Sequence, residues 1–467
     1  DCAWEKIYQR LEKQGRLEEF LQQPVQMRDY SKINFKFVND YVKSIRAERL
    51  EGYYGGVHPL ERKEYTEHLA LKRFPDPEEV VIPLSMHAGA PANPVVQVGD
   101  TVKVGQKIGE AAAFISSPVH SSVSGTVTAI ENRGHATRGE CLSVVIKSDG
   151  KNTLHESVKP HKGLEELTPD EIVEIVKEAG IVGMGGAGFP TSVKLKPAKP
   201  VDTILLNGCE CEPLLTADHR VLLEFADDVI YGLKAILKDN KPDAIRLMTE
   251  KTADLENIEV VTAKTKYPQG AEKMLIKRVT GRKVPSGGLP ADVGCIVSNI
   301  STTKAIADAI LTGMPLIERV VTVTGERVKN PGNFIVKIGT NTKALIDYCG
   351  GVTGNDVTIK AGGPMMGFLL TDTNVPIMKG SNGIIAVDTD HTAEQPCIKC
   401  GRCMDVCPME LSPLYFAKFA DEENWQGMKD KNVMDCIECR CCEYICSSKI
   451  PLVTKIKAGK NAVRGMK

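Results

Sequence analysis

Cysteine placement is the feature that most constrains this chain of 467 residues. Nine of its fifteen cysteines lie between Cys397 and Cys446, and eight of those nine form two runs with the same spacing, Cys-x2-Cys-x2-Cys-x3-Cys. An extracellular disulfide protein would spread its cysteines in pairs through a small scaffold, whereas this chain is long and shows no apolar run typical of a signal peptide. The clustering therefore predicts metal binding in a reducing compartment.

The repeated spacing is typical of bacterial ferredoxins that hold two 4Fe–4S clusters. Each iron of a cluster needs one thiolate; three cysteines of a run surround one cluster, and the fourth, after the x3 gap, reaches the other. The ligands expected for cluster one are Cys397, Cys400, Cys403 and Cys446. The ligands expected for cluster two are Cys407, Cys436, Cys439 and Cys442.

Two zinc sites, or buried free thiols, are the alternatives to iron–sulfur clusters. Zinc sites usually use two cysteine pairs separated by a longer loop, so the duplicated run of four favours iron–sulfur. Cys441 adds a fifth thiol to the second run, and its spacing predicts that it is not a ligand. The cysteines outside the two runs are expected to be ordinary small residues: Cys2, Cys141, Cys209, Cys211, Cys295 and Cys349.

Composition excludes some classes of protein. The chain has 59 Lys and Arg against 60 Asp and Glu, a net charge of −1, which gives no support to nucleic acid as the main partner. Its 42% hydrophobic and 25% charged residues are typical of globular chains. No apolar stretch approaches the roughly 18 residues that a membrane-spanning helix needs, so none is expected.

Changes of pattern divide the chain into five expected segments, giving a multidomain protein of the α/β and α+β classes. They are a helical extension (1–54), a barrel-sandwich-like β domain (55–150), an α/β domain (151–312), a β-grasp module with a connecting segment (313–390) and a two-cluster ferredoxin-like domain (391–467). In the fourth segment, residues 319–352 read as strand, turn, strand and helix, which resembles the small ligand-binding β-grasp module of respiratory flavoproteins.

The second segment contains short valine-rich runs on either side of Gly99 and Asp100, which predict strands joined in hairpins. This stretch resembles the barrel-sandwich fold of biotinyl and lipoyl carriers. Those carriers need a modifiable lysine on an exposed hairpin, and no lysine occurs between Ile108 and Val123. The resemblance therefore extends to the fold and not to the swinging-arm function.

The α/β segment begins with a helix predicted over 168–179. Thr168 is the expected N-cap, Pro169 the first helical residue, Glu171 the partner in a capping box and Gly180 the end. Strand-like and helical patterns then alternate, which indicates an α/β domain: residues 203–206, 217–237, 244–249 and 258–262.

A glycine-rich loop, Gly183–Pro190, follows this helix and contains the pattern GxGxxG. The dinucleotide fingerprint needs a strand before the loop, and here a capped helix precedes it, so the ordinary Rossmann fingerprint is rejected. Backbone without side-chain bulk can still approach a phosphate or a flat ring closely. A flexible connection is the alternative reading of this loop.

Polar residues follow several strand-like runs of the same segment. They occur at 207–213, 267–273 and 298–303. Each alone is more often a solvated loop, but ligands of α/β proteins bind where polar groups follow the strands. Together with the glycine loop these segments predict one ligand site.

These motifs resemble two related families. Gly183–Pro190 with Thr191 and Lys194, the pattern Asn207-x2-Glu210-x-Glu212-Pro213, and the later segments 267–272 and 299–302 are similar to the FMN and NADH site of the flavin subunit of respiratory complex I. The span from Gly55–Pro59 to Pro451–Val453 is closer still to the RnfC subunit of the Rnf complex. Further matching stretches are residues 287–292 and 362–367.

The resemblance implies a function. The Rnf complex is a membrane-bound ferredoxin:NAD oxidoreductase that couples electron transfer to Na⁺ or H⁺ pumping. RnfC is its peripheral NAD(H)-side subunit on the cytoplasmic side of the bacterial membrane, with non-covalent FMN and two 4Fe–4S clusters. The implied partners are a ferredoxin-like iron–sulfur subunit and integral membrane subunits, and residues 151–312 become a Rossmann-like FMN/NADH-binding domain.

The resemblance also implies roles for residues. The glycine loop would pack on FMN and the nucleotide through Gly183, Gly185, Gly186 and Gly188. Flavin polar groups would be bound by Asn207, Asn299 and Thr302, and the nicotinamide nucleotide by Phe189 and Lys194. The nucleotide pocket would be lined by Glu210, Glu212 and Glu272. No acid–base catalyst is expected. Complex I has acidic residues where Cys209 and Ala271 stand here.

Two other functions remain open at this stage. One is a related flavin and iron–sulfur reductase that is soluble and serves a cobalamin or proline reductase system; it would not co-purify with hydrophobic subunits. The other is a non-enzymatic electron-wiring protein, which would hold iron without FMN and would not oxidise NADH.

Overall fold

The computed structural model describes residues 53–239, 244–249 and 259–466. These residues belong to one contact unit, residues 52–467. The helical extension predicted over residues 1–54 lies outside the described part of the chain, apart from its last two residues. Cys2 also lies outside it.

Two small sheets form the barrel-sandwich part of the chain. One has the order β2 (Glu79–Pro83), β8 (Gly139–Ser148), β7 (Gly125–His135) and β4 (Thr101–Val102). The other has the order β3 (Asn93–Pro94), β5 (Lys107–Glu110) and β6 (Val119–His120). Ile82, Ile108 and Val144 are fully buried in a shared core.

The predicted hairpins around Gly99 and Asp100 are wrong. A turn does form there, since the Asp100 N–H donates to the Gln97 carbonyl at 3.1 Å. The flanking strands, however, join different sheets: β3 pairs with β5, and β4 pairs with β7. The chain crosses between the sheets because Val96 and Val102 then both bury their side chains in the core that the two sheets share.

The α/β part is built on a four-stranded parallel sheet. Its order is β11 (Glu259–Thr262), β10 (Ala244–Thr249), β9 (Thr203–Gly208) and β12 (Cys295–Asn299). Because side chains alternate along a strand, Ile204 and Leu206 face one side of the sheet and Leu205 the other. All four strands end at the same edge, where their loops gather.

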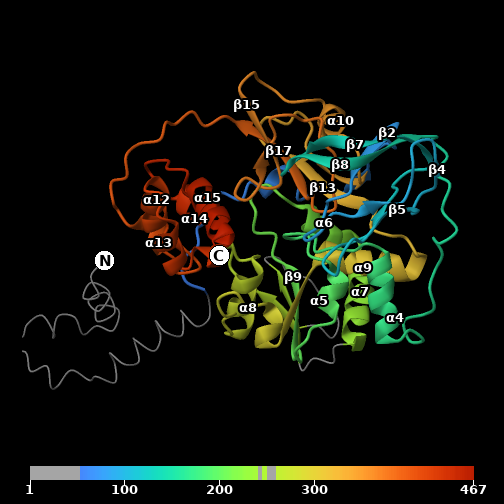
Figure 1. Ribbon diagram of the computed structural model, residues 1–467, viewed down its shortest axis with the longest axis horizontal. Coiled ribbons are helices and arrows are strands. Elements are labelled where there is room, and N and C mark those ends of the chain that lie inside the picture. Colours follow the sequence, from blue (N-terminus) through green and yellow to red (C-terminus); the bar gives the residue numbers. More distant parts are fainter. Residues whose placement is uncertain (1–52, 240–243, 250–258, 467) are drawn as a thin grey trace, which may run out of the picture. The chain divides into compact units, whose positions relative to one another are not determined.

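Helices cover both faces of this sheet (Figure 1). The core around Ile204 and Leu206 includes residues of α4 (Pro169–Glu178), α6 (Ala217–Glu224), α7 (Ala226–Asp239) and α9 (Ile300–Thr312), and the core around Leu205 includes α8 (Glu272–Thr280). The short helix η4 (Pro290–Val293) precedes β12. The single helix predicted over 217–237 is in fact two, because Phe225, with φ −132°, leaves the helical conformation between α6 and α7.

A mixed six-stranded sheet follows in the fourth segment. Its order is β1 (Leu71–Arg73), β14 (Gly332–Lys337), β13 (Glu318–Thr324), β17 (Gly383–Asp388), β15 (Val357–Ala361) and β16 (Phe368–Leu369). The helix α10 (Thr342–Tyr348) comes after β14, so the predicted order of strand, turn, strand and helix over 319–352 is confirmed.

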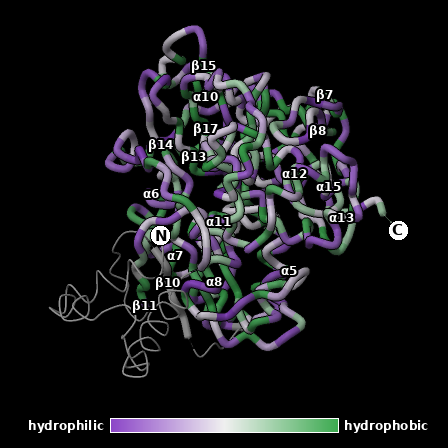
Figure 2. The backbone as a smooth tube through the Cα atoms, turned by 90° about the vertical axis from the view of Figure 1, so that its left-hand side faces the viewer, coloured by the Kyte–Doolittle hydropathy of each residue, from purple (hydrophilic) through white to green (hydrophobic). Residues whose placement is uncertain are grey.

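The cysteine-rich segment is helical apart from its loops. It contains α11 (Arg402–Asp405), α12 (Pro413–Asp421), α13 (Trp425–Asp430), η5 (Val433–Asp435), α14 (Cys441–Tyr444) and α15 (Leu452–Gly465). Within the part of the chain that the structure describes, no helix combines the length and the apolar character needed to cross a bilayer. Polar and apolar residues are interspersed along the whole tube in Figure 2.

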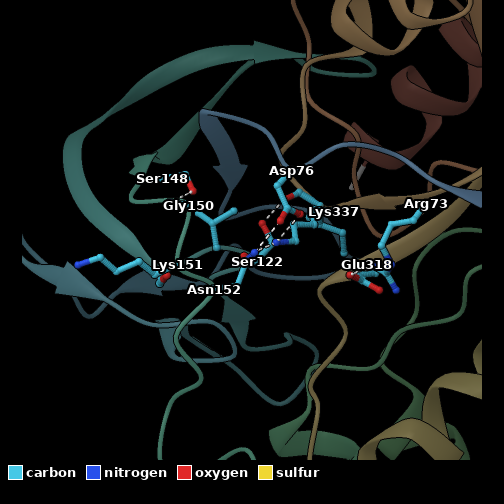
Figure 3. A network of polar contacts seen from close by, with 12 residues as sticks. Arg73, Asp76, Ser122, Ser148, Gly150, Lys151, Asn152, Glu318 and Lys337 are labelled. Carbon is cyan, nitrogen blue, oxygen red and sulfur yellow. Dashed lines mark hydrogen bonds and ion pairs between the residues drawn. The ribbon is translucent and has the colours of Figure 1, made fainter.

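A polar network fastens the six-stranded sheet to the barrel-sandwich part (Figure 3). Lys337 on β14 forms an ion pair with Asp76 at 2.8 Å and donates to Asn152 Oδ1 at 2.5 Å. Ser122 donates to the Ile338 carbonyl at 2.6 Å. Charged and neutral hydrogen bonds together therefore fix how these two parts pack.

The helix α4 starts and ends as the sequence predicts. The Glu171 N–H donates to Thr168 Oγ1 at 3.3 Å, and the Thr168 N–H donates to Glu171 Oε2 at 2.7 Å, so the capping box is complete. Gly180 follows the last turn with φ +64°, the left-handed conformation that favours glycine there.

Replacing Thr168 by alanine removes one half of this capping box. The T168A variant should lose about 1 kcal/mol of stability, because the first turn of α4 loses an acceptor for its free N–H groups. Denaturant unfolding followed by circular dichroism measures the change. T168S keeps the hydroxyl and serves as the control; equal stability of T168A and T168S would contradict the cap's role.

Candidate functional site

The glycine loop leaves α4 at Gly180 and enters the short helix α5 (Thr191–Leu195). It is closed at its base, since the Gly183 N–H donates to the Phe189 carbonyl at 2.8 Å. Between these points residues 185–187 are exposed. A methyl group on Gly186 would meet no protein atom within 4 Å, so the space beside this residue is open to a ligand.

Two asparagines stand at the carboxyl edge of the parallel sheet. Asn207 lies near the end of β9 and is paired in register with Asn299, which ends β12. Asn299 is also the N-cap of α9, and its Oδ1 accepts from the Thr302 N–H at 3.2 Å. Thr302 Oγ1 in turn accepts from the Met184 N–H at 2.9 Å. The sheet edge, the first turn of α9 and the glycine loop therefore form one site.

Asp218 and Arg319 also belong to this site, although neither is among the residues predicted from the sequence. The Asp218 carboxylate accepts from Asn299 Nδ2 and Ser301 Oγ, both at 2.6 Å. Arg319, on β13, is buried and donates from Nη2 to the Met184 carbonyl at 3.3 Å. Its Nε makes no hydrogen bond among the described residues.

The charge of Arg319 is balanced by two carboxylates. Burial lowers the pKa of its guanidinium, while Asp218 and Glu210 raise it. The sequence signal was available: Arg319 is a lone charge at the head of the apolar run 320–323. Asp218 gave no such signal, since an acid in the first turn of a helix is ordinary.

Glu210 faces the first turn of α6 from inside the protein. Its carboxylate accepts from the Asp218 and His219 N–H groups, both at 3.2 Å. Burial raises its pKa to about 7. The Lys63 ammonium fixes the backbone beside it by donating to the carbonyls of Glu210 at 2.5 Å and Leu215 at 2.7 Å. The structure thus places Glu210 as a support for the site's wall.

Glu212 is engaged on the opposite side of its loop. Its carboxylate accepts from the Met365 and Met366 N–H groups at 3.0 and 2.8 Å and from the Tyr267 hydroxyl at 3.4 Å. Burial raises its pKa as well. Its three donors come from segments outside the glycine loop.

The remaining predicted residues lie on the α5 and α8 side of the sheet edge. Lys194 forms an ion pair with Glu272 at 2.6 Å and donates to the Val297 carbonyl at 2.9 Å. Asn207 Nδ2 donates to the Gly270 carbonyl at 2.8 Å. Phe189 is half-buried beside Gly188, whose φ of +69° favours glycine.

A cavity in the cysteine-rich segment is bordered by the four cysteines assigned to cluster two. Its wall also holds Cys441 and apolar side chains, and it includes Cys407, Cys436, Cys439, Cys441, Cys442, Leu411, Phe416, Val453 and Ile456. Burial raises the pKa of Cys442, and the neighbouring Cys439, Cys436 and Cys407 raise it further. A set of thiols around an apolar cavity fits a 4Fe–4S cluster.

The thiols assigned to cluster one are also neighbours. Burial raises the pKa of Cys403, and Cys446, Cys397 and Cys400 raise it further. Cys446 thus lies with the first run, and Cys407 lies with the second. No group of three or more His, Cys, Asp or Glu among the described residues is arranged to hold a single metal ion; a cluster differs because its own atoms separate the thiolates.

Backbone amides support the sulfur atoms at both centres. The Leu411 N–H donates to Cys407 Sγ at 3.3 Å, and the Glu438 and Lys399 N–H groups donate to Cys436 and Cys397 Sγ, each at 3.4 Å. Hydrogen bonds to ligand sulfurs are one of the means by which proteins tune cluster potentials.

Tyr267 joins the cysteine-rich segment to the sheet edge. Its side chain is 1% exposed and shares an apolar cluster with Val57, Met365, Cys439 and Cys441. The Cys441 thiol donates to the Tyr267 carbonyl at 3.9 Å, and the Tyr267 hydroxyl reaches Glu212. The wall of the cluster-two cavity therefore packs on the α/β part of the chain.

The cysteines outside the runs lie away from both thiol groups with one exception. Cys211 Sγ accepts from the Gly270 N–H at 3.2 Å, beside Tyr267 in the same apolar cluster. Cys209, Cys295 and Cys349 are buried, and Cys141 is half-buried.

The raised pKa of Glu210 makes stability depend on pH. Its pKa rises from 4.5 to about 7 on folding, so its contribution is present below pH 4.5 and is lost as the pH rises through about 7. The melting temperature of the wild type should therefore fall relative to that of E210Q across this window. Calorimetry at several pH values measures the difference; a constant difference would contradict the assignment.

Family comparisons match the chain in four consecutive stretches. They are the Nuo51 FMN-binding domain (176–308), the RnfC barrel sandwich hybrid domain (51–151), the SLBB domain (320–369) and the 4Fe-4S dicluster domain (391–447).

Curated relatives match over most of their length. The chain is 45% identical to the RnfC subunit of the Na(+)-translocating ferredoxin:NAD(+) oxidoreductase complex of Acetobacterium woodii over 88% of this chain and 96% of the relative. It is 46% identical to the corresponding subunit of the proton-translocating complex of Clostridium ljungdahlii over 83% and 88%. Among solved structures, an NAD+-reducing [NiFe]-hydrogenase in the H2-reduced state has a TM-score of 0.44 at 18% identity, covering 64% of each chain.

Proposed function

The chain belongs to the RnfC family, the NAD(H)-side subunits of the ion-translocating ferredoxin:NAD(+) oxidoreductase (Rnf) complexes, and we propose that it is the electron-transfer subunit that exchanges electrons with NAD(H) in such a complex. It carries FMN and two 4Fe–4S clusters and acts as an NADH-dependent oxidoreductase. Its partners are the other subunits, among them a ferredoxin-like iron–sulfur subunit and integral membrane subunits. It is attached peripherally on the cytoplasmic side of the membrane.

One observation carries this proposal beyond the family match. The open glycine loop at the edge of the parallel sheet and the cysteine-lined cavity lie in one unit, joined through Tyr267. A flavin exchanges two electrons with a nicotinamide as hydride and single electrons with a cluster, so it belongs between them. The join at Tyr267 supports electron transfer between these sites.

The residues then have distinct tasks. The backbone of Gly183, Gly185, Gly186 and Gly188 holds the flavin and admits the nicotinamide to close approach. Asn207, Asn299 and Thr302 fix the sheet edge and bind flavin polar groups, and Phe189 and Lys194 hold the nucleotide. Glu272 orients Lys194 through their ion pair.

Glu210 and Glu212 act behind these groups, because their carboxylates already accept hydrogen bonds from the protein. Asp218 and Arg319 keep Asn299 and Met184 in place. The two thiolate sets bind the clusters, as grouped above.

The finer structural assignments are part of the same proposal. The parallel order β11-β10-β9-β12 supports a Rossmann-like FMN/NADH domain over 151–312. The antiparallel pair β13 and β14 beside α10 supports a β-grasp module within 313–390. The remaining expected bounds are 1–54, 55–150 and 391–467.

Cofactor analysis tests this function directly. Protein purified without oxygen should contain FMN and about eight irons per chain, since two 4Fe–4S clusters hold that number. Adding NADH should bleach the flavin absorbance. A preparation with iron but no FMN would favour the electron-wiring alternative, and one with neither would contradict the proposal.

Substitution of Cys439 and Cys441 distinguishes a ligand from its neighbour. C439S should lose the signal of cluster two and about half of the iron, because one of its four thiolates is gone. C441S should keep the iron content of the wild type. Iron analysis and electron paramagnetic resonance (EPR) measure both variants; iron loss in C441S with none in C439S would reverse the assignment.

Bulk at Gly186 tests the glycine loop. The G186V side chain would project into the open space beside the loop, so FMN binding and NADH oxidation should be lost. The iron content should not change, because the thiolate sets lie elsewhere. G281A is the matched control, since a Cβ there also meets no atom within 4 Å. Normal FMN content in G186V would contradict the loop's role.

A further inference from the structure

Lys379 is a fully buried lysine that lies between three segments of the chain. Its ammonium group donates to the Gly180 carbonyl at 2.6 Å, to the Pro118 carbonyl at 2.7 Å and to Ser117 Oγ at 3.5 Å. An ammonium group has three donors, so these three acceptors use all of them. Lys379 forms no ion pair within the described residues.

Two of its acceptors border the glycine loop and the barrel-sandwich part. Gly180 closes the end of α4, shortly before the loop, and Pro118 directly precedes β6. A positive charge at the end of α4 also interacts favourably with the helix dipole. At the other end of the loop, the Ala88 N–H donates to the Gly188 carbonyl at 2.9 Å. The barrel-sandwich part therefore holds the glycine loop on both sides.

The packing around Gly180 leaves no slack. A methyl group there would lie 2.5 Å from the Pro118 carbonyl oxygen, 2.9 Å from Lys379 Nζ and 3.3 Å from His120 Nδ1. A buried lysine without a carboxylate partner costs stability, so other groups must offset that cost. Here the compensation is the fixed geometry of two carbonyls from different parts of the fold.

We propose that Lys379 is a positioning residue for the flavin site: it ties the start of the glycine loop to the barrel-sandwich domain and thereby sets where the loop's N–H groups point. This inference rests on the proposed function of the loop as the flavin site. It also gives the barrel-sandwich domain, which has no lysine for a swinging arm, a role in shaping that site.

The titratable groups facing Lys379 cannot replace its charge. His120 on β6 and His87 both have their pKa lowered by burial and by Lys379, to about 4 in the case of His87. Lys107 on β5 faces His120 and adds further positive charge, and Arg138 does the same beside His87. Burial lowers the pKa of Lys379 itself to about 7.

Replacement of Lys379 by methionine tests the proposal. K379M keeps much of the length of the side chain but removes the three donors, so FMN should bind about tenfold more weakly, with unchanged iron content. K337M is the matched control, because Lys337 is also largely buried between the barrel-sandwich part and the six-stranded sheet but contacts Asp76 and Asn152 away from the loop. FMN titration of the deflavinated protein measures both variants.

The pH profile separates positioning from space filling. Wild-type FMN affinity should weaken as the pH rises through about 7, because the neutral amine has two donors and weaker hydrogen bonds. K379M should lack this dependence. Equal FMN affinity of K379M and wild type, or identical pH profiles, would overturn the proposal.

Hydrogen exchange on the wild type tests the proposal if K379M does not fold. After correction for intrinsic rates, protection of amides in residues 181–188 should fall as the pH rises through about 7, while amides around Ile338 should not change. Constant protection of the loop would overturn the proposal. Because exchange needs no bound flavin, a wild type that binds no FMN would contradict the proposed function and leave the result for Lys379 readable.

Discussion

The packing of the cysteine-rich segment on Tyr267 is the constraint that links the two redox sites of this molecule. Nicotinamide chemistry moves electron pairs and a cluster moves single electrons, so the two sites are useful to each other only at close range. The Cys441 thiol contacts the Tyr267 carbonyl, the Tyr267 hydroxyl contacts Glu212, and Glu212 precedes the helix that carries Asp218. Electron transfer between the sites can therefore take place within one rigidly packed region.

Buried charge is the second organising element of the flavin site. Asp218 and Glu210 lie with Arg319, Lys63 secures the loop beside them, and Lys379 holds Gly180 at the entrance to the glycine loop. Isolated buried charges are costly, and each of these groups is instead given hydrogen-bond partners from distant segments. Apolar replacements would remove that cost, but they would also remove the contacts that fix the geometry of the loop.

Local signals predicted much of this structure, and long-range contacts did not. The capping box of α4, the grouping of thiols across the two runs and the polar residues after β9 and β12 follow from spacing and strand order. The break at Phe225, the crossing between sheets at Gly99 and the arrival of Arg319 and Lys379 at the glycine loop depend on packing between distant segments. No periodicity in one sequence encodes these contacts.

The most direct test of the proposed function follows electrons from the clusters to the nicotinamide. Protein is reduced without oxygen, freed of excess reductant and mixed with NAD⁺, and the cluster signals are followed by freeze-quench EPR in the wild type and in G186V. We predict that NAD⁺ oxidises the clusters of the flavin-loaded wild type and leaves those of G186V reduced. Equal oxidation in both, or none in the wild type, would contradict electron transfer through a flavin at the glycine loop.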